Sequence, residues 1–324
     1  MKKVLVTGAT GFTGSHLVRR LLKEGYAVRA FIRKRSSKLP SGIEIVMGDL
    51  RDKDSIVKAV KGIDIIFHVA AQFQDYRAKD KVYWEVNVEG TKYLLEEALK
   101  NDIERFIHCS TVGVLGDVKE IPANEDTPPN PGDIYQITKY EAEKLALEYY
   151  KKHGLPVVVI RPAGIYGPGD MRLLKLFKLI SENKFVMFGN GDKLYHLTYI
   201  DDLINGFILC ATKKGIEGEI FIIAGEEPIT VKELVKQISE TLGVPYPRRR
   251  FPLFPVFVAS ILCEKICKLF GVSPPLFPRR LDFFRKNRAF SIEKAKKVLG
   301  YEPQIDLKTG LKRTIEWYKM NGYL

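Results

Sequence analysis

Cysteines are few in this sequence, and long apolar runs are missing. The 324 residues include four cysteines, with no Cys-x-x-Cys pair and no cluster of Cys and His. We therefore expect neither a disulfide framework nor a zinc or other metal site. The chain reaches Gly8 after a run of only three apolar residues, 4–6, so we expect no signal peptide. Because no apolar run is long enough to span a bilayer, the sequence predicts a cytoplasmic protein.

Acidic residues are also scarce relative to basic ones. Lys and Arg number 52 against 39 Asp and Glu, which gives a net charge of +13. This balance favours anionic partners, such as phosphorylated ligands or an anionic membrane surface. Since the sequence carries no nucleic-acid-binding motif, we do not expect DNA or RNA as a partner. The basic residues gather in two segments, 1–50 and 243–290.

The order of apolar segments predicts an α/β fold. Short, almost purely apolar strands alternate with amphipathic helices, which indicates a Rossmann-type, doubly wound parallel sheet covered on both faces. After Gly167 this rhythm changes. We therefore divide the chain into a dinucleotide-binding domain (1–168) and a smaller, mostly helical substrate lobe (169–324), with segment 197–225 returning to the first domain. We expect strands at 4–6, 27–32, 43–47, 63–69, 105–109, 156–160 and 219–224, and helices at 15–24, 52–60, 86–100, 134–153, 171–182 and 230–242.

A glycine-rich segment follows the first predicted strand and precedes the first predicted helix. Glycines there allow a tight turn and a close approach of the backbone to a pyrophosphate, which binds the N–H groups at the start of the helix. The spacing is Gly-x-x-Gly-x-x-Gly and differs from the Gly-x-Gly-x-x-Gly dinucleotide fingerprint. The residues predicted to contact the cofactor are Gly8, Thr10, Gly11, Phe12, Thr13 and Gly14.

This spacing resembles that of the extended short-chain dehydrogenase/reductase superfamily, also known as the NAD-dependent epimerase/dehydratase family. Its 3β-hydroxysteroid-dehydrogenase-like and dihydroflavonol-reductase-like members are the most similar. Further motifs of the family follow in order over nearly the whole chain: Gly-Asp-Leu at 48–50, His-Val-Ala-Ala at 68–71, Asn-Val-Glu-Gly-Thr at 87–91, Cys-Ser-Thr-Val-Gly-Val-Leu-Gly at 109–116, Tyr-Gln-Ile-Thr-Lys at 135–139, and Arg-Pro-Ala-Gly-Ile-Tyr-Gly-Pro-Gly-Asp at 161–170.

The resemblance implies roles for several of these residues. Asp49 and Leu50 are expected to hold the adenine, and Ala70 and Ala71 to line the cofactor cleft. Pro162 and Gly164 belong to a segment expected to pass the nicotinamide. The resemblance also implies a homodimer formed through the helix that carries the Tyr-x-x-x-Lys motif.

The end of the second strand bears on the choice between NADP and NAD. A carboxylate there recognises the free ribose 2′-hydroxyl of NAD, whereas a cation accommodates the 2′-phosphate of NADP. Ile32 occupies the usual acidic position, and Arg33 follows it. We therefore predict NADP in preference to NAD, with Arg33 on the 2′-phosphate and Arg29 or Arg35 assisting.

Tyr135 and Lys139 lie four residues apart, on one face of a predicted helix. A tyrosine phenol has a pKa of about 10 and is a poor acid or base at neutral pH, but a nearby ammonium lowers such a pKa. Tyr135 is thus predicted to exchange a proton with the substrate oxygen, while Lys139 assists and also binds the nicotinamide ribose, as in the family. Thr111 matches the family's hydroxyl that orients the substrate, with Ser110 as a second possibility. Tyr140 and Lys144 form a competing pair.

Two features indicate an apolar substrate. Tyr195 stands where nucleotide-sugar enzymes of the family carry an arginine, and Gly169-Asp170 follow Tyr-Gly-Pro, as in the steroid and flavonol group. Segment 251–263 is strongly apolar and has basic residues on both sides. It is either a buried lid helix or, over residues 248–270, a peripheral membrane contact.

The sequence thus predicts an oxidoreductase that interconverts an alcohol and a ketone on a small apolar molecule. An NAD-dependent nucleotide-sugar 4-epimerase or dehydratase is the first alternative, since arginines at 172, 285 and 288 offer charges for a diphosphate. A non-catalytic dinucleotide-sensing protein is the second, and the Thr111, Tyr135 and Lys139 set speaks against it.

Overall fold

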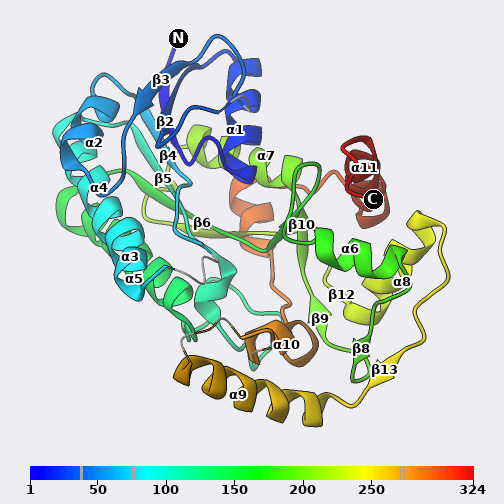
Figure 1. Cartoon of the computed structure of the whole chain (residues 1–324). Helices are drawn as coiled ribbons and strands as arrows, with labels where there is room; N and C mark the ends of the chain where they lie inside the picture. Colours follow the sequence, from blue (N-terminus) through cyan, green and yellow to red (C-terminus); the bar gives the residue numbers. More distant parts are fainter. Residues whose placement is uncertain (37–38, 74–77, 271, 273, 277) are drawn as a thin grey trace.

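A parallel sheet of seven strands forms the centre of the molecule (Figure 1). The computed structural model describes the whole chain except residues 37–38, 74–77, 271, 273 and 277. The strand order, β11-β6-β5-β4-β1-β2-β3, confirms the predicted Rossmann-type fold. The strands are β1 (Lys3–Thr7), β2 (Ala27–Ile32), β3 (Glu44–Met47), β4 (Ile65–His68), β5 (Arg105–Cys109), β6 (Val157–Pro162) and β11 (Ile220–Ile223).

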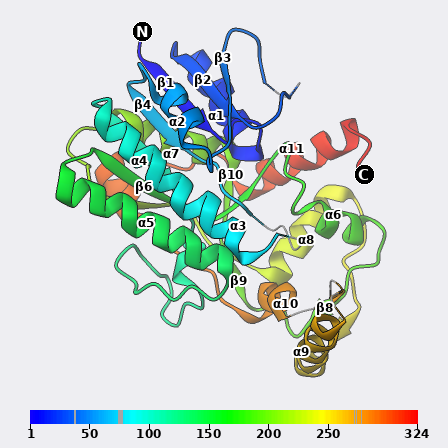
Figure 2. The same ribbon diagram turned by 60° about the vertical axis from the view of Figure 1, so that its left-hand side comes forward.

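The central strands are apolar because the sheet is covered on both faces, whereas the edge strand β3 is largely exposed. Val4 and Val6 of β1 enter one hydrophobic core, and Leu5 between them enters the other. Helices α1 (Phe12–Lys23) and α7 (Ile200–Thr212) cover the first face. Helices α2 (Lys53–Val60), α4 (Gly90–Lys100) and α5 (Ile134–His153) cover the second, and Figure 2 shows α4 and α5 side by side there. A strand buried on both faces loses the polar alternation of a half-exposed strand.

The helix predicted at 86–100 is longer and less regular than expected. It begins as α3 (Asp80–Trp84), passes through the π-helical turn η1 (Glu85–Glu89) and continues as α4. Asn87 lies within this π turn. The sequence pattern missed the first part, in which Val82 and the buried Tyr83 stand among charged residues. Single π turns inside α-helices are frequent at functional sites.

The chain reverses its direction of winding beside β1. β1 pairs with β2 on one side and with β4 on the other, and both pairings are parallel. In an open parallel sheet, ligands bind outside the carboxyl ends of the strands at such a reversal. The ends of β1 and β4 therefore mark where a site is expected.

The smaller lobe lies next to these carboxyl ends. Strand β10 lies directly before α7. Strand β11, which follows α7, pairs with β6 at the edge of the main sheet. The domain boundary at residue 168 stays a prediction. The remaining elements are η2 (Val112–Leu115), β7 (Gly164–Tyr166), α6 (Leu174–Ser181), β8 (Met187–Phe188), β9 (Leu194–Tyr195), β10 (Leu197–Tyr199), β12 (Ile229–Thr230), α8 (Val231–Leu242), β13 (Arg250–Phe251), α9 (Leu253–Leu269), α10 (Pro278–Arg285), η3 (Ala295–Leu299) and α11 (Leu307–Met320).

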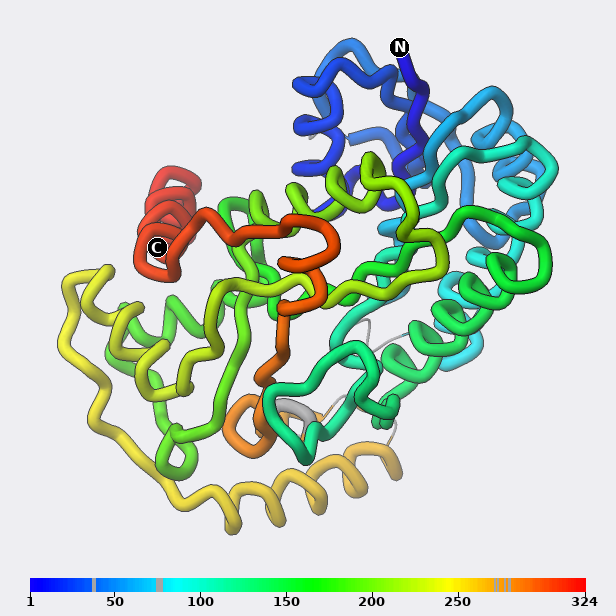
Figure 3. Tube along the Cα trace, turned by 180° about the vertical axis from the view of Figure 1, so that it is seen from behind, coloured from blue at the N-terminus to red at the C-terminus, as the bar shows by residue number. Residues whose placement is uncertain are grey.

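The apolar segment 251–263 is not a buried lid. From Leu253 onward it forms part of the longer helix α9, which runs along the outer edge of the smaller lobe (Figures 1 and 3). Ser260 is the one residue of α9 that is fully buried. None of the described helices has both the length and the apolar character needed to cross a membrane.

Candidate active site

A cleft of about 1200 Å³ opens at the carboxyl ends of β1 and β4, between the sheet and the smaller lobe. Lys139 is the one predicted site residue that is not on its wall. The predicted residues that line it are Gly8, Thr10, Gly11, Phe12, Thr13, Gly14, Arg33, Asp49, Leu50, Ala70, Ala71, Thr111, Tyr135, Pro162 and Gly164.

The glycine-rich loop is shaped for a closely bound anion. Gly8 has a φ of +70°, and a Cβ on it would lie 2.8 Å from the backbone nitrogen of Ala70. A Cβ on Gly14 would lie 2.1 Å from the carbonyl oxygen of Gly8. Gly11 is the N-cap of α1 and brings no side chain to the amides of the first turn. These amides and the helix dipole suit a pyrophosphate, so the loop fits the expected dinucleotide.

Among the described residues, the cations that line the end of the cleft next to β2 and β3 are Arg33, Lys34 and Arg51. Arg51 donates to both carboxylate oxygens of Asp49, over 3.0 and 2.9 Å. This pairing lowers the pKa of Asp49, with Arg33 adding a smaller effect. Sequence reasoning missed Arg51, although it directly follows the Asp49-Leu50 motif at the end of a strand.

Arg29 cannot assist Arg33, contrary to the sequence-based prediction. Its buried guanidinium donates to the carbonyl oxygens of Ala59 and Lys61, over 2.7 Å each, and pairs with Glu44 at 2.9 Å. An arginine in the middle of β2 points across the sheet toward α2 and away from the strand's carboxyl end. Arg35, the other proposed helper, is exposed and does not belong to the described cleft wall.

Thr111 and Ser110 follow β5 but have different surroundings. Thr111 is the N-cap of η2, and its Oγ1 accepts a hydrogen bond from the Gly113 amide over 3.0 Å. This bond uses the Thr111 oxygen as an acceptor, so the hydroxyl hydrogen of Thr111 is available to a substrate oxygen. Ser110 is buried and donates to Glu143 Oε2 over 2.6 Å. The structure therefore favours Thr111 over Ser110 as the hydroxyl that meets a substrate.

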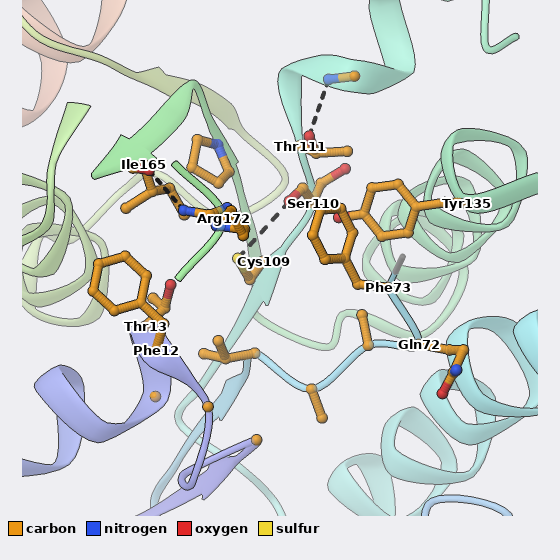
Figure 4. A pocket seen from close by; sticks show the side chains of 18 of the residues that line it. Phe12, Thr13, Gln72, Phe73, Cys109, Ser110, Thr111, Tyr135, Ile165 and Arg172 are labelled. Atoms are coloured by element: carbon orange, nitrogen blue, oxygen red, sulfur yellow. Dashed lines mark hydrogen bonds between the residues drawn. The ribbon is translucent and has the colours of Figure 1, made fainter. Parts of the chain in front are cut away.

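Tyr135 lies in the first turn of α5, and its ring meets Phe73 edge-on at 4.8 Å between centroids. Figure 4 shows Tyr135, Phe73 and Thr111 at the cleft. Asp133 caps the helix by accepting from the Gln136 amide over 3.1 Å. This cap fixes where α5 begins and hence the position of Tyr135.

Lys139, one turn further along α5, is buried behind the cleft wall. Burial lowers the pKa of Lys139, while Cys109 and Glu143 act in the opposite direction. The competing pair lies elsewhere: Lys144 stacks over the Tyr140 ring at 5.0 Å and pairs with Glu141 at 2.7 Å. Neither member of that pair belongs to the described cleft wall.

Asn87 ties the cleft wall to α5. Its side chain accepts from the Gln72 amide over 2.7 Å and donates to Thr138 Oγ1 over 3.0 Å. Gln72 and Phe73 lie on the wall, and Thr138 precedes Lys139. Asn87 thus supports the backbone of the cleft wall from its position within the π turn.

Two of the histidines near the predicted site, His68 and His196, are structural. His68 joins Thr7 to Thr91 through its two ring nitrogens, over 2.9 and 2.8 Å, and burial lowers its pKa to about 3. His196 lies on the cleft wall, but its nitrogens are bonded to the backbone of Gly225 and Phe290. Burial lowers the pKa of His196 as well.

The end of the cleft nearest the smaller lobe is mainly apolar and aromatic, with cations at its margin. Arg172 is held by Asp170 and by the Ile165 carbonyl, over 2.7 and 2.6 Å. Arg288 stacks on Tyr195 at 5.8 Å. Apolar side chains on this wall are Phe73, Val112, Ile165, Leu173, Phe283 and Phe290, and cations are Arg172, Lys286 and Arg288. Arg285, a third arginine considered for a diphosphate, instead covers the ring of Phe257.

Comparison with known proteins gives a consistent result. The model of the NAD dependent epimerase/dehydratase family matches residues 4–224. A 3β-hydroxysteroid dehydrogenase/Δ5→4-isomerase of Mycobacterium tuberculosis is 32% identical, over 98% of this chain and 90% of its own length. The decarboxylating sterol-4α-carboxylate 3-dehydrogenase of Mus musculus is 29% identical, over 97% and 90%. Among solved structures, UDP-glucuronic acid 4-epimerase from Bacillus cereus with NAD has a TM-score of 0.80 at 28% identity, over 98% and 99%.

Proposed function

Since the chain belongs to the NAD dependent epimerase/dehydratase family and is an enzyme of its NAD-dependent oxidoreductase type, we propose that it interconverts an alcohol and a ketone on a small apolar substrate. One observation carries this proposal: Thr111 and Tyr135 line the same cleft as the glycine-rich loop, next to a wall of apolar and aromatic side chains. The similarity to hydroxysteroid and sterol dehydrogenases over nearly the whole chain supports the same substrate class.

In this proposal the chain's own residues bind, orient and move a proton. The Thr111 hydroxyl donates to the substrate oxygen, and the Tyr135 phenol exchanges a proton with that oxygen. Lys139 supports Tyr135 electrostatically from behind the wall. A nicotinamide dinucleotide, when bound, supplies or accepts the hydride. Phe73 packs edge-on against Tyr135 and helps to orient its ring.

We further propose that the dinucleotide is NADP. Arg33, Lys34 and Arg51 line the adenosine end of the cleft, and buried Ile32 stands where a carboxylate would select NAD. The Asp49 carboxylate is already paired with Arg51. The charges of Arg33 and Lys34 therefore make this end of the cleft positive, which favours binding of a 2′-phosphate.

The test is turnover of a hydroxysteroid by the purified enzyme, followed by the change in reduced nicotinamide. Tyr135→Phe keeps the ring and its contact with Phe73 but removes the acid. We expect it to lower kcat by at least about a hundredfold, with cofactor affinity nearly unchanged. Retention of wild-type turnover would remove Tyr135 from the mechanism. The homodimer implied by the resemblance stays a prediction, to be checked by sedimentation equilibrium.

One observation favours a second candidate, a nucleotide-sugar epimerase. Arg172, Lys286 and Arg288 stand at the margin of the substrate end, where they could meet a diphosphate. The epimerase from Bacillus cereus shares the fold across nearly the whole chain. Conversion of a UDP-sugar with no net change in nicotinamide redox state would support this candidate over the first.

A further inference from the structure

Helix α9 combines an apolar sequence with an exposed position. A helix that is hydrophobic all round is normally buried. Yet Phe254, Leu262, Ile266 and Leu269 have exposed fractions of 75%, 55%, 54% and 83%. Their spacing places them, with Val258, along the outer side of the helix. The molecule thus presents a continuous apolar stripe to its surroundings, hereafter the α9 stripe (Phe254, Val258, Leu262, Ile266 and Leu269).

The inner side of α9 accounts for its position on the lobe. Ser260 is buried and donates to the Phe257 carbonyl oxygen over 2.6 Å. The guanidinium of Arg285, on α10, lies 3.7 Å from the centre of the Phe257 ring. The helix is therefore fixed against α10 through its inner side, and the α9 stripe stays outside.

Basic residues stand at both ends of the stripe. Arg248, Arg249 and Arg250 precede α9 and are exposed, and Lys265 and Lys268 lie near its end. Segment 248–270 contains one acid, Glu264, which pairs with Lys268 at 3.4 Å. An apolar helix with cations at both ends is typical of helices that lie in the headgroup region of an anionic bilayer.

We propose that the α9 stripe docks on the surface of an anionic lipid bilayer. The 17 residues of α9 are fewer than the 20 or so of a spanning helix, which fits a helix lying in the plane of the membrane. A second copy of the chain is a poorer occupant. Two facing α9 stripes would bring clusters of like charge together, whereas anionic headgroups complement those clusters.

Docking in this orientation also brings the cleft close to the membrane. Helix α10 lies between α9 and the central sheet in Figure 1, and its Asp282 and Phe283 line the cleft wall. The substrate end of the cleft would thus lie close to the bilayer, from which an apolar substrate could enter. This last step rests on the proposed function, but the docking itself does not, because binding to vesicles is measured without turnover.

The experiment is cosedimentation of the full chain with vesicles of phosphatidylcholine, alone or mixed with phosphatidylglycerol. We expect the wild type to bind the mixed vesicles more strongly, and added salt to weaken that binding. The Leu262→Gln/Ile266→Gln double variant should bind the mixed vesicles at least about tenfold more weakly than the wild type, because it makes the stripe polar. Since both side chains point outward, its thermal unfolding should match that of the wild type.

The matched control is Val57→Gln/Met320→Gln, which changes two exposed apolar residues on α2 and α11. This control should bind vesicles like the wild type. Three results would overturn the proposal: no binding of the wild type to the mixed vesicles, full binding by Leu262→Gln/Ile266→Gln, or a wild-type dimer that this double variant splits. The last would assign the stripe to a second copy of the chain.

Discussion

Ser110, a buried residue of the cleft wall, donates its hydroxyl hydrogen to Glu143 Oε2 over 2.6 Å. Arg161 donates to the other carboxylate oxygen, Oε1, over 2.6 Å. A buried carboxylate needs both partners, since unpaired buried charge is costly. Ser110 is therefore engaged in holding β5, β6 and α5 together, and the adjacent Thr111 is left for the substrate.

The hydroxyl of Thr111 is the first target for mutation. Thr111→Val keeps the shape of the side chain but cannot donate to a substrate oxygen, so we expect kcat to fall by about a hundredfold. Thr111→Ser keeps the hydroxyl and should retain most of the activity. Steady-state kinetics of both variants check this. Near-normal turnover of Thr111→Val would exclude a role for this hydroxyl.

Ser110→Ala should behave differently from Thr111→Val. It removes one hydrogen bond from the buried Glu143 carboxylate, so the unfolding free energy should fall by about 1–3 kcal/mol. Denaturant unfolding measures this loss. If Ser110→Ala left stability unchanged and Thr111→Val did not impair turnover, the assignment of the two hydroxyls would be reversed.

Selectivity for NADP tests the pocket at the end of β2. Arg33→Ala should raise KM for NADPH by about tenfold or more, because a charge-assisted contact with the 2′-phosphate is lost, and should leave KM for NADH nearly unchanged. Arg35→Ala removes an equal charge two residues away, from a side chain outside the described cleft wall. Equal effects of the two substitutions would mean that only general electrostatics operate.

Lys139 gives a prediction with opposite effects on activity and stability. Burial lowers its pKa in the folded state, so the unfolded chain binds the proton more readily below the usual lysine pKa of about 10.4. The stability of the wild type should therefore rise with pH through the range between the two pKa values. Lys139→Met should lose this rise and gain stability at neutral pH, while kcat falls. A variant less stable than the wild type at pH 7 would contradict the assigned cost of burial.

Buried histidines should make the protein sensitive to acid. Among the described residues neither ring nitrogen of His108 has a hydrogen-bond partner, and burial lowers its pKa well below the usual value. The unfolded chain takes up this proton below about pH 6.5, so stability falls as the pH drops further. His108→Leu should reduce the slope of unfolding free energy against pH by up to about 1.4 kcal/mol per pH unit. The exposed His153, changed to Leu, is the matched control for the loss of a surface histidine.

The local pattern of the sequence was sufficient to predict the parallel sheet and the tight glycine-rich loop. Parallel strands buried on both faces leave apolar runs, and Gly8 and Gly14 stand where any side chain would collide with the backbone. What depended on long-range packing could not be predicted. The ion pair with Glu44 on a neighbouring strand holds Arg29 away from the cofactor pocket. The residues around Arg29 in the sequence do not indicate this contact.

The same holds for α9 and for the π turn. An apolar run predicts burial, but whether another element covers it depends on the whole lobe, and α9 is left exposed. Asn87, within the π turn, contacts Gln72 and Thr138, which lie 15 and 51 residues away along the chain, so the local sequence does not show these contacts. Arg51 is far from Arg33 in the sequence, and the parallel pairing of β2 with β3 brings both to the same end of the cleft.

The most direct test of the proposed activity is to denature the purified enzyme, identify any nucleotide released, and titrate the empty protein with NADPH and NADH. The proposal predicts an enzyme that exchanges its cofactor and binds NADPH more tightly than NADH. One NAD retained per chain through purification would contradict it and would favour the epimerase, in which the cofactor never leaves.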